Sequence, residues 1–405
     1  MARPMTKVSK VRVAGPLAPF AEEFRLRLRD QGYTPLSTVN QLRLVAQLSR
    51  WLEAGGFSTA DLTEGRVEEF LAARRAAGYT GLISPRALVP LLEFLAGRDE
   101  LPAAEPWVPS SRSEEVLAAF ERYLLCERGL VASTASAYVR GAGRFMAAYA
   151  PDGQLGEVSA ADVTRAVLDE SAALSVGSAQ MFVASLRSLL RFCHIEGLVG
   201  ADLSAAALTV TGRRTSSLPQ GMSTSDAEAL LCSCDRRTAV GRRDYAVIIT
   251  LLRLGLRASE LATLSLDDID WRAGEIVVHG KGRREDRLPL PVDVGEAITG
   301  YLQRGRPTTT RREVFVTAIA PIAALQRGGV SSIVRRACVR AGIPPVGAHR
   351  LRHTAACEMV RAGVPLTEIG QALRHHSLTS TSGYARVDVD GLRTLAQPWP
   401  TGVQS

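Results

Sequence analysis

The sequence lacks the cysteine pattern of a disulfide framework or a structural zinc site. Six cysteines are scattered along the 405 residues, and none stands in paired CxxC spacing. Cys232 and Cys234 lie close together, but no second Cys or His pair follows at ligand spacing. A zinc knuckle is therefore excluded, and free thiols in a reducing compartment are expected.

Long hydrophobic runs are also missing. No stretch of eighteen apolar residues occurs, and the basic N-terminus has no continuous apolar segment of the kind found in a secretory signal. These absences argue against a membrane-spanning or secreted protein. We expect a soluble, cytoplasmic protein with no membrane partner.

Charge of one sign is in modest excess. Lys and Arg number 49 against 41 Asp and Glu, a formal net charge of +8. Such a balance favours an anionic partner without identifying it, and solvated basic helix faces would give the same excess. The length predicts two or three domains, each able to bury its own core.

Helical periodicity and Pro-rich punctuation predict the domain boundaries. Residues 1–100 form a helical unit and 110–205 a second one, while 219–396 form a third domain. Asp61–Val67 parallels Glu157–Val163 at an offset of about 96 residues, so the first unit is interpreted as a diverged duplicate of the second. Ordinary helix packing in unrelated sequences would mimic this parallel.

The third domain alone shows strand patterns. Leu266–Trp271, Glu275–His279 and Arg284–Leu290 are short alternating or β-branched runs between turn residues, and helical patterns surround them. The predicted fold class is therefore mainly α with a small antiparallel β-sheet in the C-terminal domain.

One set of side chains in this domain suits phosphoryl transfer. Arginines grip phosphate oxygens, Lys and His move protons, and a Tyr hydroxyl attacks phosphorus without a metal or nucleotide cofactor. The candidates are Arg257, Lys281, His349, Arg352, His375 and Tyr384.

The contexts of these residues resemble those of the tyrosine recombinases, or phage integrase family. Arg257 lies in Leu254-Gly-Leu-Arg-Ala-Ser-Glu-Leu261, and Lys281 lies in Gly280-Lys-Gly-Arg-Arg284. His349-Arg-Leu-Arg-His-Thr354 holds the next two candidates, and Tyr384 follows His375 by nine residues. The resemblance covers roughly residues 219–396. It implies that residues 110–205 form a SAM-like core-binding domain that holds DNA.

The resemblance also implies a role for each candidate. Tyr384 would be the nucleophile, and Arg257 with Arg352 would clamp the non-bridging phosphate oxygens. Lys281 would protonate the departing 5′ oxygen, and His349 would exchange the proton of Tyr384. Each of these side chains, taken alone, is ordinarily a packing or surface residue.

Two assignments leave alternatives open. His375 is favoured over His376 as the hydrogen-bond donor to the phosphate, although the family usually has Gly where this chain has Arg374. Glu260 matches an acidic partner that steadies such sites, while an ordinary helix-surface ion pair would look the same in sequence.

His349 and His353 also have half of a zinc-helix spacing, but Arg350 replaces the expected Glu, so no metal is predicted.

The implied function is site-specific DNA recombination through a 3′-phosphotyrosyl intermediate, with no cofactor. The implied partners are double-stranded DNA with inverted-repeat sites, three further copies of this chain in a tetramer on paired sites, and accessory recombinases. Two rival hypotheses are a type IB topoisomerase, which shares the Arg, Lys, His and Tyr chemistry, and an inactive DNA-binding accessory protein. The complete residue set argues against the second.

Overall fold

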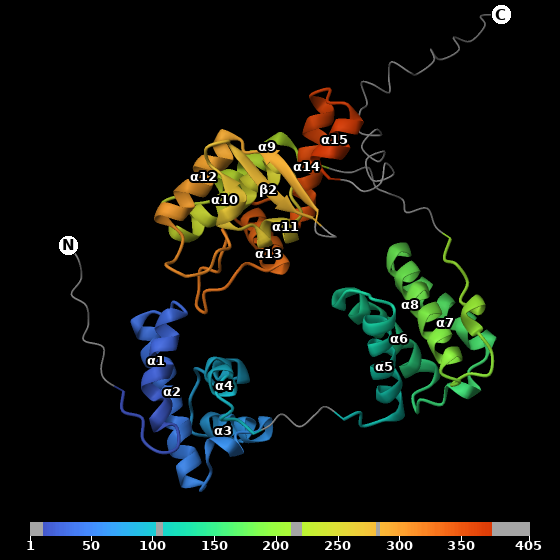
Figure 1. Ribbon diagram of the computed structural model, residues 1–405, viewed down its shortest axis with the longest axis horizontal. Coiled ribbons are helices and arrows are strands. Elements are labelled where there is room, and N and C mark those ends of the chain that lie inside the picture. The colour runs from blue at the N-terminus through green and yellow to red at the C-terminus, as the bar shows by residue number, and fades with distance from the viewer. Residues whose placement is uncertain (1–10, 103–107, 212–220, 281–283, 375–405) are drawn as a thin grey trace, which may run out of the picture. The chain divides into compact units, whose positions relative to one another are not determined.

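The computed structural model describes residues 11–102, 108–211, 221–280 and 284–374 (Figure 1). Within them the chain is mostly helical with one three-stranded antiparallel sheet, so the predicted fold class is confirmed. The chain divides into two compact units, Met1–Ala104 with Leu218–Ser405 and Glu105–Ser217. The three-domain division and the duplication remain predictions.

The segment up to residue 102 is helical because apolar side chains recur every three or four residues. These side chains gather into one core that includes Phe24, Leu48, Phe70 and Phe94, and the rings of Phe24 and Phe94 lie 5.5 Å apart. The helices are η1 (Ala18–Phe20), α1 (Ala21–Asp30), α2 (Pro35–Ala54), η2 (Thr59–Asp61), α3 (Glu64–Ala76), η3 (Pro85–Ala87) and α4 (Val89–Ala96).

The second unit forms its own core around Phe120, Phe145 and Phe192. Residues 203–206 form a short helix that packs on its last two long helices, so the sequence after Ala201 belongs to this unit at least to Val210. The helices are α5 (Arg112–Arg122), η4 (Tyr123–Glu127), α6 (Ala132–Tyr149), η5 (Leu155–Glu157), α7 (Ala160–Ala173), α8 (Val176–Ile195) and η6 (Leu203–Ala206).

The segment from residue 221 is built around one buried helix, α10. Most of its side chains are buried, and α12, α13 and α14 pack against it. Thr238 caps its first turn, and Gly255 ends it in the left-handed region with φ of 57°. The helices are α9 (Thr224–Cys232), α10 (Ala239–Leu254), α11 (Ala258–Thr263), η7 (Leu266–Asp268), α12 (Val292–Arg304), α13 (Arg327–Ala341), α14 (Ala348–Arg361) and α15 (Leu366–Ala372).

The sheet lies between α11 and α12 in the sequence. Its strands β1 (Ile269–Asp270), β2 (Glu275–His279) and β3 (Glu285–Pro289) are antiparallel in that order. Ile276 and Val278 are buried in the same core as α10, because alternate side chains of a strand point to one face. β2 and β3 form an antiparallel hairpin, whose last described pair is His279 with Glu285.

The last described helices form a small separate cluster. Ala356 and Val360 of α14 pack with Ile369 and Leu373 from α15 and the turn after it. This packing fixes the path of the chain up to Arg374. No helix among the described residues is long and apolar enough to cross a membrane.

Candidate active site

Arg257 stands where two helices meet. Gly255 ends α10, and Arg257 is the N-cap of α11. A side chain at position 255 would be strained, because φ there is positive and a Cβ would lie 2.7 Å from Cδ2 of Leu373, which would have to shift. The tight turn brings the start of α11 against the turn that follows α15.

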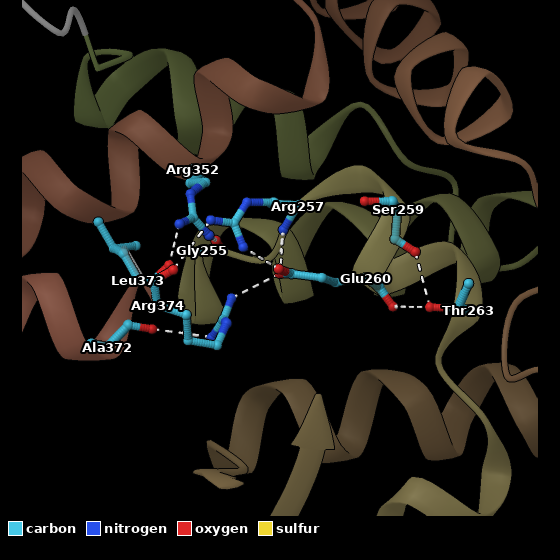
Figure 2. A network of polar contacts seen from close by, with 9 residues as sticks. All are labelled: Gly255, Arg257, Ser259, Glu260, Thr263, Arg352, Ala372, Leu373 and Arg374. Atoms are coloured by element: carbon cyan, nitrogen blue, oxygen red, sulfur yellow. Dashed lines mark hydrogen bonds and ion pairs between the residues drawn. The ribbon is translucent and has the colours of Figure 1, made fainter. Parts of the chain in front are cut away.

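Arg352 binds both the turn at Gly255 and the turn that follows α15. It lies on α14, its side chain is almost fully buried, and one Nη donates to the carbonyl oxygen of Gly255 at 2.6 Å. Its other Nη donates to the carbonyl oxygen of Leu373. Figure 2 shows the two guanidinium groups of Arg352 and Arg257 beside each other. The two arginines of the predicted clamp are therefore brought together.

Glu260 joins Arg257 to a residue that the sequence did not single out. The Glu260 carboxylate accepts from the Arg257 backbone N–H at 2.8 Å and from its Nη1 at 2.5 Å. It also accepts from Nη2 of Arg374 at 2.9 Å. Glu260 is 3% exposed, so the alternative of a helix-surface ion pair is wrong. Burial acts to raise the pKa of Glu260, but the charge of Arg374 and the bonds from Arg257 outweigh it and lower this pKa.

Two histidines lie on α14 beside Arg352. His349 and Arg352 share one helix face, as their spacing of three predicts, and the rings of His349 and His353 are 4.4 Å apart. Burial lowers the pKa of His349, and the charges of Arg352 and Arg257 lower it further. Both effects favour a neutral imidazole at neutral pH, which is the form that can accept a proton.

Three predicted site residues lie outside the described residues, namely Lys281, His375 and Tyr384, and so does His376. The described residues nearest to Lys281 are Gly280 and Arg284, at the hairpin of β2 and β3. The Gly280 N–H donates to the carbonyl oxygen of Arg284 at 2.8 Å. It also reaches Arg374, the residue before His375. The catalytic roles of all six residues remain predictions. Across the described ranges, no three His, Cys, Asp or Glu side chains gather as metal ligands would.

Arg374 is the residue that sequence reasoning missed. It has φ of 54°, which is unusual for a residue with a side chain, and only 8% of its surface is exposed. One signal in the sequence pointed to it, namely an Arg at a place where the family usually has Gly. Its partner Glu260 is 114 positions earlier, so no local pattern connects the two.

Comparison with known proteins agrees with this architecture. Residues 220–390 match the Phage integrase family. A putative integrase/recombinase, y4rA of Sinorhizobium fredii, is 41% identical over 96% of this chain and 96% of its own length. Tyrosine recombinase XerD of Mycobacterium tuberculosis is 32% identical over 67% of this chain and 93% of its own length.

Solved structures share the fold at low identity. XerH site-specific recombinase bound to palindromic difH substrate covers 82% of this chain and 94% of its own, with a TM-score of 0.57 and 19% identity. A lambda integrase dimer bound to a COC′ core site covers 72% of this chain and 99% of its own, with a TM-score of 0.53 and 18% identity. From its similarity to its relatives along nearly its whole length, the chain belongs to the phage integrase family of tyrosine recombinases.

Proposed function

We propose that this protein is a site-specific DNA recombinase that cuts and rejoins strands through a 3′-phosphotyrosyl intermediate. The observation that carries the proposal is the convergence of Arg257 and Arg352 around the turn that leads to His375. Both guanidinium groups bind adjacent carbonyl oxygens of this turn, so they occupy one small region. The names of the two relatives favour recombination over the relaxation of supercoils by a type IB topoisomerase.

Cleavage begins with the Tyr384 hydroxyl. Its oxygen attacks the scissile phosphorus, its proton passes to His349, and a bond to phosphorus forms as the bond to the 5′ oxygen breaks. A phenol has a pKa of about 10, so it needs an acceptor and positive charge nearby. The neutral imidazole of His349 beside Arg352 supports the assignment of the acceptor.

The arginines act on the charge that develops at phosphorus. As the phenolic oxygen joins the phosphodiester, the non-bridging oxygens gain negative charge, and charge-assisted bonds to guanidinium groups strengthen. Arg352 is fixed by two backbone carbonyls, and Arg257 is fixed by Glu260. Such preorganised donors reduce the barrier because little reorganisation is needed during the reaction.

The remaining steps involve residues outside the described ranges. Lys281 gives a proton to the departing 5′ oxygen, and His375 donates a hydrogen bond to the phosphate. The 5′ hydroxyl of another strand then attacks the phosphotyrosine and restores a phosphodiester. Because the covalent link to tyrosine keeps the energy of the phosphodiester bond, the reaction requires neither ATP nor a metal ion.

Exchange between two duplexes requires several active sites at once. We propose a homotetramer on two paired sites with inverted repeats, with accessory recombinases as further partners. The XerH and lambda integrase structures, which were determined bound to DNA, support double-stranded DNA as the substrate.

The test traps the covalent intermediate. A bound site is first selected from random double-stranded DNA, and a nick placed beside its cleavage position lets the short 5′ product diffuse away. Wild type should accumulate a protein–DNA adduct on a denaturing gel, and Tyr384→Phe should bind the site without forming it. Tyr245→Phe, which removes a hydroxyl from a ring stacked under Arg236, is the matched control and should form the adduct. An adduct with Tyr384→Phe would overturn the assignment of the nucleophile.

A further inference from the structure

Arg374 is held in its place at a cost to stability. Its backbone is in the left-handed region, and its Nε is buried without a hydrogen-bond partner among the described residues. Its side chain is 5% exposed, which places a charged group away from water. A residue that carries three such costs beside a functional site is a candidate for a role in function.

The contacts of Arg374 indicate what it offsets. Its Nη2 binds Oε2 of Glu260, and its Nη1 donates to the carbonyl oxygen of Ala372 at 3.1 Å. Its own carbonyl oxygen accepts from Nη2 of Arg257 at 3.2 Å. Arg374 and Arg257 therefore share one carboxylate and are also joined directly (Figure 2).

Charge at the site depends on this sharing. Without Arg374, the buried carboxylate of Glu260 would face Arg257 alone and would neutralise much of the charge that Arg257 offers to a phosphate. With Arg374, three guanidinium groups stand against one carboxylate, so two positive charges remain in excess. The transition state of phosphoryl transfer carries more negative charge than the bound phosphodiester, so it gains most from this excess.

We propose that Arg374 is a positioning residue for strand cleavage, which binds Glu260 and thereby leaves Arg257 available to the scissile phosphate. This inference rests on the proposed function. It assigns to this chain a third arginine in the phosphate site, which acts through Glu260 and Arg257 and does not need to touch DNA.

The test compares two substrates that differ in charge at the scissile linkage. One has an ordinary phosphodiester, and the other has a methylphosphonate, in which a methyl group replaces a charged non-bridging oxygen. Single-turnover cleavage by wild type, Arg374→Gly, Arg374→Gln and Arg374→Lys is measured on both. Glycine adopts a positive φ without strain, so Arg374→Gly should remain folded.

Arg374→Gly and Arg374→Gln should cleave the phosphodiester about 10- to 100-fold more slowly than wild type, as is typical for partners that orient a binding group. Glutamine can still hydrogen-bond to Glu260, so its loss of rate isolates the charge. Arg374→Lys keeps the charge and should retain most of the rate. On the methylphosphonate, the difference between wild type and the two uncharged variants should shrink to about threefold or less, because less charge needs compensation.

The control is Arg237→Gln, which removes a positive charge from an exposed ion pair with Asp235 before the start of α10. It should leave both rates unchanged. Equal losses on both substrates would show that Arg374 only maintains the fold, and no loss on the phosphodiester would also overturn the inference. If wild type forms no Tyr384-dependent adduct, the proposed function fails and this inference fails with it.

Discussion

Arg352 of α14 donates to the carbonyl oxygen of Leu373, which follows α15 and lies two residues before His375. The same guanidinium binds Gly255, two residues before Arg257. One buried side chain thus ties together the backbone beside two other predicted site residues. A contribution of Arg352 to catalysis therefore has to be separated from its contribution to stability.

Arg352→Lys should lower both cleavage and stability. A lysine keeps the charge, but it lacks the planar guanidinium whose two Nη atoms bind both carbonyl oxygens. The free energy of unfolding should fall by about 3 kcal/mol, because buried hydrogen bonds from a charged group to Gly255 and Leu373 are lost. Urea denaturation measures this change.

Arg257→Lys is the matched comparison, because the Arg257 side chain is 34% exposed. It should lower cleavage as strongly as Arg352→Lys but reduce the free energy of unfolding by about 1 kcal/mol or less. Equal losses of stability in the two variants would contradict the different anchoring of the two arginines.

Lys281 is expected to protonate the departing oxygen, and this role can be tested by changing the leaving group. An alkoxide leaves poorly without a proton, whereas a thiolate leaves readily because its conjugate acid is stronger. Lys281→Ala should cleave ordinary DNA very slowly and recover most of the rate when sulphur replaces the 5′ bridging oxygen. Arg352→Ala should not recover, since its proposed role is to bind the non-bridging oxygens. Recovery of both variants, or of neither, would reduce Lys281 to a positioning contact.

Acid should destabilise the protein through His353. Burial, followed by the charges of His349, Arg350 and Arg352, lowers the pKa of His353 to about 4. An unfolded histidine has a pKa of about 6.5, so between these values the unfolded chain takes up a proton that the folded chain does not. The free energy of unfolding should therefore fall as the pH is lowered from about 6.5 to about 4.

Urea midpoints over this pH range, compared between wild type and His353→Gln, measure the effect. The variant should have the flatter profile. His279→Gln serves as the contrasting control, because a hydrogen bond with Asp268 raises the pKa of His279. Its native side chain stabilises the fold at low pH, and that stabilisation is lost as the pH rises through its raised pKa. Parallel profiles for wild type and His353→Gln would contradict the lowered pKa.

DNA binding should weaken steeply with salt. Each neutralised phosphate contributes a slope of about −0.9 when the logarithm of the binding constant is plotted against the logarithm of the salt concentration. Because both the predicted core-binding domain and the C-terminal domain should contact phosphates, we expect a slope of several units. The slope is measured by fluorescence anisotropy with the selected DNA site at salt concentrations from about 50 to about 300 mM. A nearly flat titration would contradict a mainly phosphate-based interface.

The sequence predicted those parts of the fold that depend on local periodicity. The apolar spacing from Phe24 to Leu52 predicted helices that bury this stripe, and the alternation in Glu275–His279 predicted a strand. The three-residue spacing of His349 and Arg352 is enough to place them on one helix face, and a glycine such as Gly255 is a local signal for a helix end. These signals involve neighbours within about one or two turns, where backbone geometry fixes which side chains meet.

Long-range pairing was not predictable in the same way. Glu260 was expected to support the site, but its burial between Arg257 and Arg374 depends on how α15 packs against α14. Ala207 packs into the core of the second unit, two residues beyond the predicted bound of 205, and a short run of small residues has no periodicity that would indicate this. Arg374 shows that a departure from a family pattern can carry structural information that the pattern itself does not.

The collision that a side chain at position 255 would make with Leu373 has a consequence for engineering. In a library that randomises residues near the site, every variant at position 255 would carry the strain of a positive φ and would have to displace the Leu373 side chain. A second substitution that replaces Leu373 with a smaller residue would make room for alanine at position 255. It would not remove the backbone strain, because φ at position 255 is positive. Directed evolution of this protein should therefore keep Gly255 fixed and vary exposed positions of the helices instead.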